Sequence, residues 1–420
     1  MIIKGEEIPV YKLPFRVANH IIRKLYGFYL DRKVVDYLAK WQHVNHDEER
    51  IIRVGFLVQD PTCWDKVEPI YDSLNNNPRF DVKLVVVPDY DFVNKTLKTE
   101  YKDNFYITNY PDAIRAFNNA AWVDLTRCFD YIFYPCPYDA YLPKEYRSDN
   151  LVKYMRCCYI PYGFSGAINF DSGNSNKDFF RNMYITFTDS AYTASLLKKN
   201  FIVKKEKDVH RIESLGYPAL KAYFFIKPLK ESKRILWTPR WSYDPLIGGS
   251  HFKEYRDIFI MLKDIYPDSE LTFRPHPLLF EELILKSIMS RKEIETYLNS
   301  LTKNNIRYDA SASLFNTLRN TDILITDYSS IIIQFFITGR PIIYCESKNI
   351  KLNDVYLKLF DGMYIAKNEE DILKFMKDLK NGNDYLFNKR QQIIRDYLQL
   401  NHFKATENIV NYIEQDFCKN

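Results

Sequence analysis

Short runs of apolar residues alternate with amphipathic stretches along most of the chain. Residues 13–48 carry apolar side chains at near-helical spacing among many Arg and Lys residues. This pattern predicts a surface helix packed on the protein, and a helix lying on a membrane is the alternative. Ile51–Val58 then has the pattern of a buried strand, Trp64–Leu74 that of a helix, and Val82–Val87 that of a second strand. A strand, helix and strand at this spacing form a βαβ unit, so a parallel sheet is expected.

The same alternation continues and divides the chain into two halves of similar size. Further strands are expected at residues 131–134, 156–160 and 184–187, and then at 234–238, 270–273, 322–326 and 341–344. The pattern predicts an α/β protein with an N-terminal helical segment over 1–48, a first domain over 49–225, a second domain over 226–400 and a C-terminal helix over 401–420.

The scarcity of glycine limits how this protein can bind phosphate. The 420 residues include only 12 Gly, where average usage of about 7% would give about 29. Neither G-x-G-x-x-G nor G-x-x-x-x-G-K-[ST] occurs in the sequence. Phosphate recognition is therefore expected from side chains rather than from a glycine-rich loop.

Charge and cysteine content narrow the choice of partners and compartment. A net charge of +5 is too small over this length to indicate a nucleic acid partner, but it suits an anionic small substrate or contact with an acidic membrane surface. The seven cysteines form no C-x-x-C pair, so neither zinc nor a disulfide framework is expected, and a reducing cytoplasm is the simplest setting. The first residues lack the apolar core of a signal peptide and no apolar run reaches about 18 residues, so neither a signal peptide nor a membrane-spanning helix is expected.

One short acidic motif has the residue pattern of a metal-binding site. Asp89-Tyr90-Asp91 follows a strand and resembles the D-x-D that binds Mn²⁺ in one large class of glycosyltransferases. We interpret it as an acidic turn after Pro88, and we expect neither a metal nor another cofactor.

Three loops of the second half carry the candidate chemistry. They are Thr238–Ser242, Arg274–Pro277 and Asp327–Ser330, and each follows a predicted strand. Because the carboxyl ends of parallel strands share one edge of the sheet, these loops should lie together. Two Arg, one His, two Ser and a helix start suit a diphosphate, because forked guanidinium groups, hydroxyls and free N–H groups all bind phosphate oxygens. His276 could protonate or polarise a leaving phosphate.

Each loop also has a purely structural interpretation. Arg274–Pro277 could form a rigid turn with a structural histidine, Asp327 with Ser329 could only cap a helix, and Arg240 could form a surface ion pair. Their conjunction at successive strand ends favours a ligand site.

The motifs around these loops resemble a known family. The segments RILWTPRWSYDP, HFKEYRDIF, LTFRPHPLL and SLFNTLRNTDILITDYSSIIIQFFITGRPIIYC resemble the nucleotide-binding half of the CDP-glycerol glycerophosphotransferases, which build teichoic acids and related capsule polymers. The resemblance covers about residues 233–400. It is weaker at VGFLVQDPTCWDKVEPIYDSL, FDYIFYPCPYDAYLP and YIPYGF in the first half.

The resemblance implies a GT-B fold, in which two Rossmann-like parallel-sheet domains face each other across a cleft, here with an N-terminal helical extension. It implies that the second domain holds a CDP-alcohol. Carried over by motif, Arg274 and His276 would contact the diphosphate, and Thr238 and Arg240 would line the cleft.

The D-Y-S-S motif has an implied role in the same site. Ser329 and Ser330 would cap the diphosphate at the start of their helix, and Asp327 would order that loop. The family pattern has an acidic residue in the following helix, where this chain has Gln334.

The general base is where the chain departs from the family. Wall teichoic acid polymerases carry a His-Gly-Thr-Pro-type motif whose His is assigned as the base, and the matching stretch here, Tyr159–Phe164, contains no His. Asp60, in the loop after the first strand, is our hypothesis for the base, with a helix cap as its structural alternative. Tyr162 and Asp139 are weaker candidates. Tyr162 could also join Tyr138 and Trp64 in an aromatic platform for sugar rings, with core packing as the alternative.

The sequence thus predicts a transferase that moves a glycerol phosphate or ribitol phosphate from a CDP-alcohol to a hydroxyl of a cell-surface polymer or its lipid-linked primer, and releases CMP. One alternative is a GT-B glycosyltransferase that uses a nucleotide-sugar donor in capsule or lipooligosaccharide synthesis. Another is a catalytically silent binding subunit of a polymer assembly complex. The expected location is the cytoplasm, with peripheral contact at the inner face of the cytoplasmic membrane as a further option.

Overall fold

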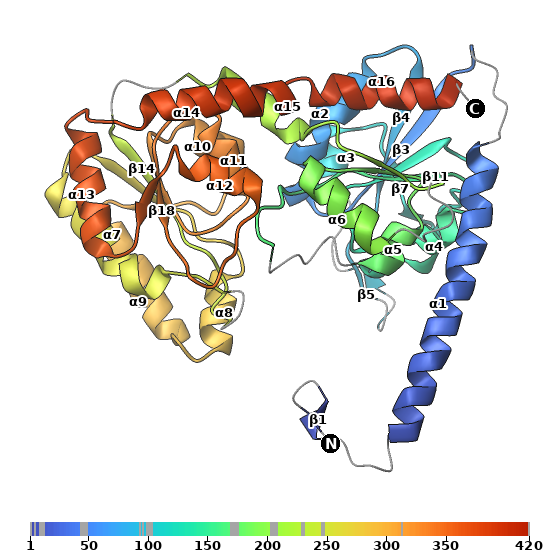
Figure 1. Cartoon of the computed structure of the whole chain (residues 1–420), viewed down its shortest axis with the longest axis horizontal. Helices are drawn as coiled ribbons and strands as arrows, with labels where there is room; N and C mark the ends of the chain where they lie inside the picture. The colour runs from blue at the N-terminus through green and yellow to red at the C-terminus, as the bar shows by residue number, and fades with distance from the viewer. Residues whose placement is uncertain are drawn as a thin grey trace.

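Two parallel β-sheets organise the chain and lie side by side in the computed structural model (Figure 1). The structure describes residues 2–3, 6–7, 13–42, 49–91, 94, 96–97, 104–168, 176–201, 209–227, 232–244, 248–311 and 314–418. All strand pairs within the two large sheets are parallel, as the βαβ pattern predicts.

The sheet of the first domain has seven strands in the order β13-β12-β11-β10-β3-β4-β7. The chain starts at the centre with β3, moves outward to one edge, and returns to the centre at β10, which is the Rossmann arrangement. The strands are β3 (Ile52–Val58), β4 (Phe80–Val86), β7 (Ile114–Arg115), β10 (Tyr131–Tyr134), β11 (Arg156–Tyr159), β12 (Ile185–Phe187) and β13 (Arg211–Glu213).

The helices that cover this sheet are mostly short. They are α2 (Trp64–Asn75), α3 (Phe105–Asn109), α4 (Ser148–Leu151), α5 (Lys177–Arg181) and α6 (Ala191–Phe201). Three small antiparallel hairpins pair β1 (Ile2–Ile3) with β2 (Glu6–Glu7), β5 (Tyr90–Asp91) with β6 (Thr96–Leu97), and β8 (Phe117–Asn118) with β9 (Ala121–Trp122).

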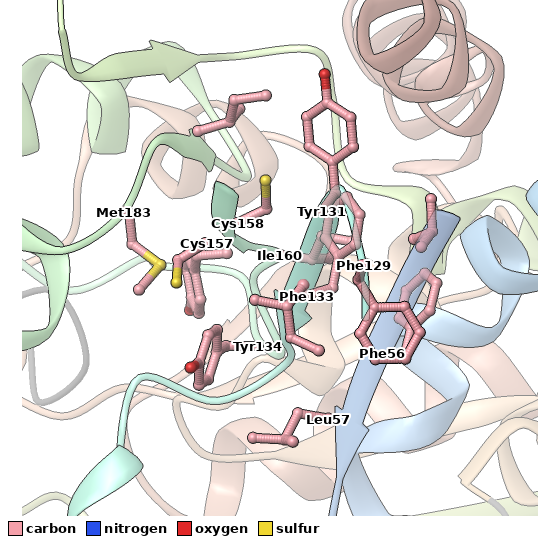
Figure 2. Packing of buried hydrophobic residues seen from close by; sticks show 14 of the residues in the cluster. Phe56, Leu57, Phe129, Tyr131, Phe133, Tyr134, Cys157, Cys158, Ile160 and Met183 are labelled. Atoms are coloured by element: carbon pink, nitrogen blue, oxygen red, sulfur yellow. The ribbon is translucent and has the colours of Figure 1, made fainter. Parts of the chain in front are cut away.

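Aromatic side chains fill much of the core of the first domain. Phe56 of β3 and Phe133 of β10 are register partners, and their rings stack 5.0 Å apart (Figure 2). Gly55 makes this packing possible, because a Cβ atom there would lie 2.7 Å from Ile132 and 2.8 Å from Phe129. The large aromatic share of the sequence is therefore used here as core volume.

The sheet of the second domain has six strands in the order β16-β15-β14-β17-β18-β19. The strands are β14 (Arg234–Thr238), β15 (Glu270–Phe273), β16 (Arg307–Tyr308), β17 (Ile323–Thr326), β18 (Ile342–Cys345) and β19 (Tyr364–Ala366). The connecting helices are α7 (Phe252–Ile265), α8 (Leu279–Leu285), α9 (Arg291–Lys303), α10 (Leu314–Arg319), α11 (Ile331–Phe336), α12 (Asp354–Phe360) and α13 (Glu369–Lys380).

Both faces of the second sheet are buried, since alternate residues of its strands belong to different hydrophobic clusters. Leu236 and Leu324 pack into one cluster, and Ile235 and Trp237 pack into the other. Burial on both faces explains why these strands are nearly continuous apolar runs in the sequence.

The last helices return from the second domain to the first, along one edge of both (Figure 1). They are α14 (Phe387–Ile393), a π-helical turn (Ile394–Gln399), α15 (Leu400–His402) and α16 (Ala405–Cys418). Helix α16 contributes Ile409 and Ile413 to the core of the first domain, and the buried Asp416 accepts a 2.6 Å hydrogen bond from the Tyr131 hydroxyl. The C-terminal helix, expected only as a helix, is thus part of the first domain's core.

Helix α1 (Leu13–Gln42) contacts the first domain with its C-terminal part. Val34, Val35 and Leu38 are buried there, and the Trp41 ring nitrogen donates a 2.9 Å hydrogen bond to the Val152 carbonyl. The surface helix expected over 13–48 therefore forms as far as Gln42, and residues 43–48 lie outside the described residues. In the part of the chain that the structure describes, no helix is both long and apolar enough to cross a membrane.

Candidate active site

The strand order of the second sheet reverses between β14 and β17, and a cavity opens at this point. Loops that leave two such strands turn to opposite faces of the sheet, which leaves a crevice between them. The Thr238 hydroxyl donates a 2.7 Å hydrogen bond to the Thr326 hydroxyl and so joins the two strand ends. The cavity has a volume of about 880 Å³ and is lined by both domains.

Eight of the nine site residues expected from the sequence line this cavity. From the first domain the lining includes Asp60, Lys66, Tyr159, residues 161–166, residues 187–189 and Thr193. From the second it includes residues 238–241, 274–278, 310–311 and 328–331, with Leu314. The exception is Asp327, which is fully buried behind the cavity wall.

Arg240 is a buried cation in the wall of the cavity, and not the surface residue of the alternative interpretation. Its side chain lies over the ring of Tyr328, with 5.3 Å between the guanidinium carbon and the ring centroid. It also donates a 3.3 Å hydrogen bond to the Tyr328 carbonyl. Burial lowers the pKa of Arg240, and the neighbouring Tyr328 and Asp327 partly offset this effect. A partly desolvated guanidinium binds an anion more strongly than one in water.

Asp327 does not line the cavity but binds to neighbouring protein groups, in agreement with the loop-ordering role that the resemblance implies. One of its carboxylate oxygens accepts hydrogen bonds from the backbone N–H groups of Arg240, at 2.8 Å, and His251, at 3.1 Å. The other oxygen lies 2.7 Å from the His251 Nδ1 atom. Asp327 therefore holds the loops after β14 and β17 together.

His251 was not found by the sequence reasoning, although it lies within one of the matching segments. Its ring stacks on Tyr255 with 5.2 Å between ring centroids. Burial by itself lowers the pKa of His251, but the hydrogen bond and charge of Asp327 outweigh it and raise this pKa above its usual value. When protonated, His251 forms an ion pair with the buried carboxylate of Asp327.

Arg274 enters the cavity wall with its guanidinium already held by the protein. It donates hydrogen bonds to the Asp309 carboxylate at 2.9 Å and to the Ser311 hydroxyl and carbonyl at 3.1 and 2.8 Å. Although burial opposes the effect, hydrogen bonds from Thr317, Ser311 and Arg274 lower the pKa of Asp309 well below its usual range. The fixed guanidinium is pre-organised, but its charge is shared with Asp309.

His276 faces the cavity as a neutral imidazole. Its side chain is exposed to the cavity, and partial desolvation there, with repulsion from Arg240 as a second cause, lowers its pKa below the usual value. Its Nδ1 atom accepts a 3.1 Å hydrogen bond from the Leu278 N–H group, so the proton of the neutral ring resides on Nε2. His276 can therefore donate a hydrogen bond from Nε2 to a phosphate oxygen.

Ser329 and Ser330 stand between β17 and α11, at the mouth of the crevice. The Ser329 hydroxyl accepts a 3.3 Å hydrogen bond from the Ile331 N–H group, whereas Ser330, at the N-cap position, makes no side-chain cap. Helix α11 is only six residues long and starts at Ile331, after both serines. The polar groups available to a ligand here are therefore the two serine hydroxyls, and the short helix adds little dipole.

The wall opposite comes from the first domain and carries Asp60, Lys66 and Tyr162. Asp60 directly precedes the 3₁₀ turn Pro61–Cys63 that leads into α2, whose own N-cap position is occupied by Cys63, so a structural role at the start of this helical stretch stays the alternative for Asp60. Burial, with the hydrogen bond to Tyr138 as the next cause, raises the pKa of Tyr162 far above its usual value. Tyr162 therefore stays protonated and can offer only a hydroxyl and a ring face.

Asp189 is a second buried acid that the sequence reasoning missed. Asp189 lies two residues after the end of β12 at Phe187. It lines the cavity, and only 1% of its surface is exposed. Its carboxylate accepts hydrogen bonds from the Ser165 N–H group and the Ser190 hydroxyl. The strand end Thr188-Asp189 repeats Thr326-Asp327 of the second domain. In both domains this Asp braces the loop that follows the neighbouring strand.

Two weaker expectations are wrong. Trp64 is buried among Tyr71, Tyr106 and Tyr110, so it cannot form a platform for sugar rings. Asp139 accepts hydrogen bonds from the N–H and hydroxyl groups of Ser148 and does not line the cavity. Within the described residues, no group of three or more His, Cys, Asp or Glu side chains is arranged to hold a metal ion.

Comparison with solved structures places this architecture among known enzymes. The chain is similar to a putative UDP-N-acetylglucosamine 2-epimerase from Listeria monocytogenes, with 13% identity, a TM-score of 0.56, and coverage of 88% of this chain and 98% of the other. It is also similar to a CDPG-soaked variant of the wall teichoic acid polymerase TagF, with 15% identity, a TM-score of 0.50, and coverage of 98% and 99%. These likenesses show that the chain has the GT-B fold.

Sequence comparison identifies the family. No curated protein matches the chain. The CDP-Glycerol:Poly(glycerophosphate) glycerophosphotransferase family matches residues 182–415, which is more than half of the chain and includes the three loops of the second domain. With the fold and the cavity described above, this match shows that the protein belongs to the CDP-glycerol:poly(glycerophosphate) glycerophosphotransferase family of transferases.

Proposed function

We propose that the protein transfers glycerol phosphate or ribitol phosphate from a CDP-alcohol to a hydroxyl of a cell-surface polymer or its lipid-linked primer, with release of CMP. The observation that carries this proposal is the cavity between the domains, with Arg240, His276 and the two serines of D-Y-S-S on one wall. This donor chemistry suits a diphosphate, and family membership supports the CDP-alcohol.

The second domain would hold the diphosphate of the donor. Arg240 supplies a buried positive charge, and the hydroxyls of Ser329 and Ser330 add hydrogen-bond donors at the same wall. His276 would donate from Nε2 to an oxygen of the diphosphate. Desolvation and, to a smaller extent, repulsion by Arg240 lower the pKa of His276, and binding of an anionic ligand would offset the repulsion.

The reaction would be a displacement at the β-phosphorus. The acceptor oxygen forms a bond to that phosphorus, the bond from the phosphorus to the bridging oxygen breaks, and the electron pair leaves with CMP. Charge grows on the bridging oxygen, so Arg240 and His276 would stabilise it there.

The acceptor would approach from the first domain and lose its proton to a base on that wall. Asp60 remains our hypothesis for the base, since its side chain is exposed to the cavity and Tyr162 is held protonated. Asp189 is engaged with the Ser165 N–H group, so we assign it a bracing role. A lipid-linked acceptor would bring the protein to the inner face of the cytoplasmic membrane.

A nucleotide panel tests the proposal. The purified protein is incubated with CDP-glycerol, CDP-ribitol, a CMP-sugar and a UDP-sugar, each with and without glycerol as a hydroxyl acceptor, and nucleotide release is followed by chromatography. We expect CMP from a CDP-alcohol. Release of nucleotide from a sugar donor alone would instead favour a glycosyltransferase, and no release from any donor would contradict the proposed activity.

Variants of cavity residues test whether CMP release occurs in the cavity. His276→Ala and Asp60→Asn should each lower the rate of CMP release by 10²-fold or more, in line with the usual contribution of a positioned acid or base. His210→Ala and Asp81→Asn are matched controls, because these two side chains lie outside the cavity lining. Unchanged transfer by purified His276→Ala would show that His276 is not part of the catalytic machinery, whereas polymer synthesis left untouched in cells by His276→Ala would favour a binding subunit.

A further inference from the structure

The hydroxyl of Tyr328 bridges the two domains beside the cavity. Tyr328 belongs to the D-Y-S-S loop of the second domain, and its hydroxyl oxygen accepts hydrogen bonds from two backbone N–H groups of the first domain, those of Gly166 at 3.1 Å and Ala167 at 2.8 Å. The residue is 8% exposed and lines the cavity. Two donors on one buried hydroxyl leave little freedom for either side to move alone.

The segment that Tyr328 holds, residues 165–168, follows β11 in the loop that matches the family's base motif. This segment is docked on the second domain at further points. The Asn353 side chain donates a 2.8 Å hydrogen bond to the Ser165 carbonyl, and the Asn353 N–H group donates one of 2.7 Å to the Gly166 carbonyl. Ile168 also donates its N–H to the Lys351 carbonyl at 2.8 Å. A stretch of the first domain is thus bonded to the second like an added strand.

Close packing at Gly166 reinforces this docking. A Cβ atom at this position would lie 2.4 Å from the Tyr356 ring, so no other residue fits without displacing the segment. The Tyr356 ring is fully buried, and its hydroxyl donates a 3.2 Å hydrogen bond to the Ser329 carbonyl. The docked segment and the serine loop therefore share one packed contact.

Tyr328 also touches the cation of the donor wall. The Arg240 guanidinium lies over its ring at 5.3 Å and donates to its backbone carbonyl at 3.3 Å. One residue thus contacts the proposed phosphate-binding cation with its ring and carbonyl, and the acceptor-side loop with its hydroxyl.

We propose that Tyr328 is a positioning residue that couples the donor-binding loops of the second domain to the acceptor-side loop 165–168, so that donor binding sets the position of the acceptor wall. This inference rests on the proposed transferase function. It assigns a role to a residue that would contact neither the acceptor oxygen nor the β-phosphorus. The physical reason is that transfer needs the acceptor oxygen close to and in line with the phosphorus, while the two substrates are held by different domains. A shift of the acceptor wall by about 1 Å would cost roughly a hundredfold in rate.

Tyr328→Phe isolates the coupling, because it keeps the ring over Arg240 and the backbone carbonyl and removes only the hydroxyl. The first readout is amide hydrogen exchange of the peptide that contains Gly166 and Ala167, measured without ligand. We expect exchange at least tenfold faster in Tyr328→Phe than in the wild type, and no change in the control Tyr308→Phe, whose side chain is exposed. Equal protection in wild type and Tyr328→Phe would overturn the proposal.

The second readout separates donor binding from acceptor reactivity. With CDP-glycerol as donor and glycerol as acceptor probe, Tyr328→Phe should bind CDP-glycerol within twofold of the wild type by calorimetry, while kcat/KM for glycerol falls at least tenfold. Asn353→Asp should act in the same direction, since it keeps the cap on α12 and loses the donor to Ser165. A parallel loss of donor affinity and acceptor reactivity would mean a merely structural role and would overturn the coupling.

The two hypotheses fail in different ways. If the wild type binds no CDP-glycerol and releases no CMP, the proposed function is wrong, yet the exchange measurement without ligand still tests the bridge. If the wild type is active and Tyr328→Phe matches it in both readouts, the coupling is wrong and the transferase function stands.

Discussion

Replacing Asp327 by Asn should destabilise the second domain in a pH-dependent manner. The wild-type carboxylate accepts two backbone N–H groups through one oxygen and contacts the His251 ring through the other. Asparagine keeps one oxygen for the N–H groups but presents a neutral amide to His251. The main loss is therefore the charged hydrogen bond between Asp327 and a protonated His251.

The direction follows from the pKa of His251. This pKa is raised in the folded protein above its unfolded value of about 6.5, so the ion pair contributes its full stability below about pH 6.5. That contribution is lost as the pH rises through the folded pKa. A hydrogen bond to a charged group contributes about 1.5–3 kcal/mol and a neutral one about 0.5–1.5 kcal/mol. We expect Asp327→Asn to cost about 2 kcal/mol near pH 6 and less than about 1 kcal/mol near pH 9.

Amide hydrogen exchange of a peptide spanning residues 323–336 measures this locally, without assuming that a two-domain protein unfolds in one step. Asp322→Asn is the matched control. Asp322 is also buried and accepts the N–H groups of Lys233 and Arg234, but its side-chain partner is the Arg234 guanidinium, which stays charged over this range. Its loss should be the same at both pH values. An Asp327→Asn loss that is equal at both, or that grows with pH, would refute the reasoning.

Three further outcomes follow from the structure. Burial lowers the pKa of His402 to about 4, and its Nδ1 atom accepts a hydrogen bond from the Tyr217 N–H group. As the pH falls, the unfolded state therefore binds a proton at this histidine before the folded state does, and the free energy of unfolding should fall by about 3 kcal/mol from about pH 6.5 to about pH 4. His402→Asn should make this decline smaller when the thermal midpoint is measured against pH. The Sγ atoms of Cys63 and Cys136 lie 3.3 Å apart at the switch point of the first sheet, so diamide should join them in a disulfide, detected by mass spectrometry as the loss of two hydrogens and abolished in Cys63→Ser. Gly55→Ala should lower the thermal midpoint at a cost of about 1–3 kcal/mol, because its methyl group would meet Ile132 and Phe129; an unchanged midpoint would show that these side chains move aside freely.

Much of the fold could be predicted because parallel strands that are buried on both faces have continuous apolar runs in the sequence. Ile323–Thr326 and Arg234–Thr238 were found within one residue for this reason. The rule that strand ends share one edge then placed Arg240, Arg274 and His276 together, and the cavity lining agrees. The packing of α16 into the first domain was not predictable, since its amphipathic pattern shows that it buries a face but not against which partner.

The sequence by itself determined the two-domain α/β architecture, the family, and the set of polar side chains at the strand ends, because these depend on local pattern and motif. Only the tertiary structure decided what each of those side chains does. Asp327 proved to be a brace because its neighbours turn it away from the cavity, and Tyr328 became a bridge because Gly166 lies opposite its hydroxyl. Contacts between residues more than 160 positions apart leave no periodic trace in the chain, so the roles that depend on them appear only when the domains are in place.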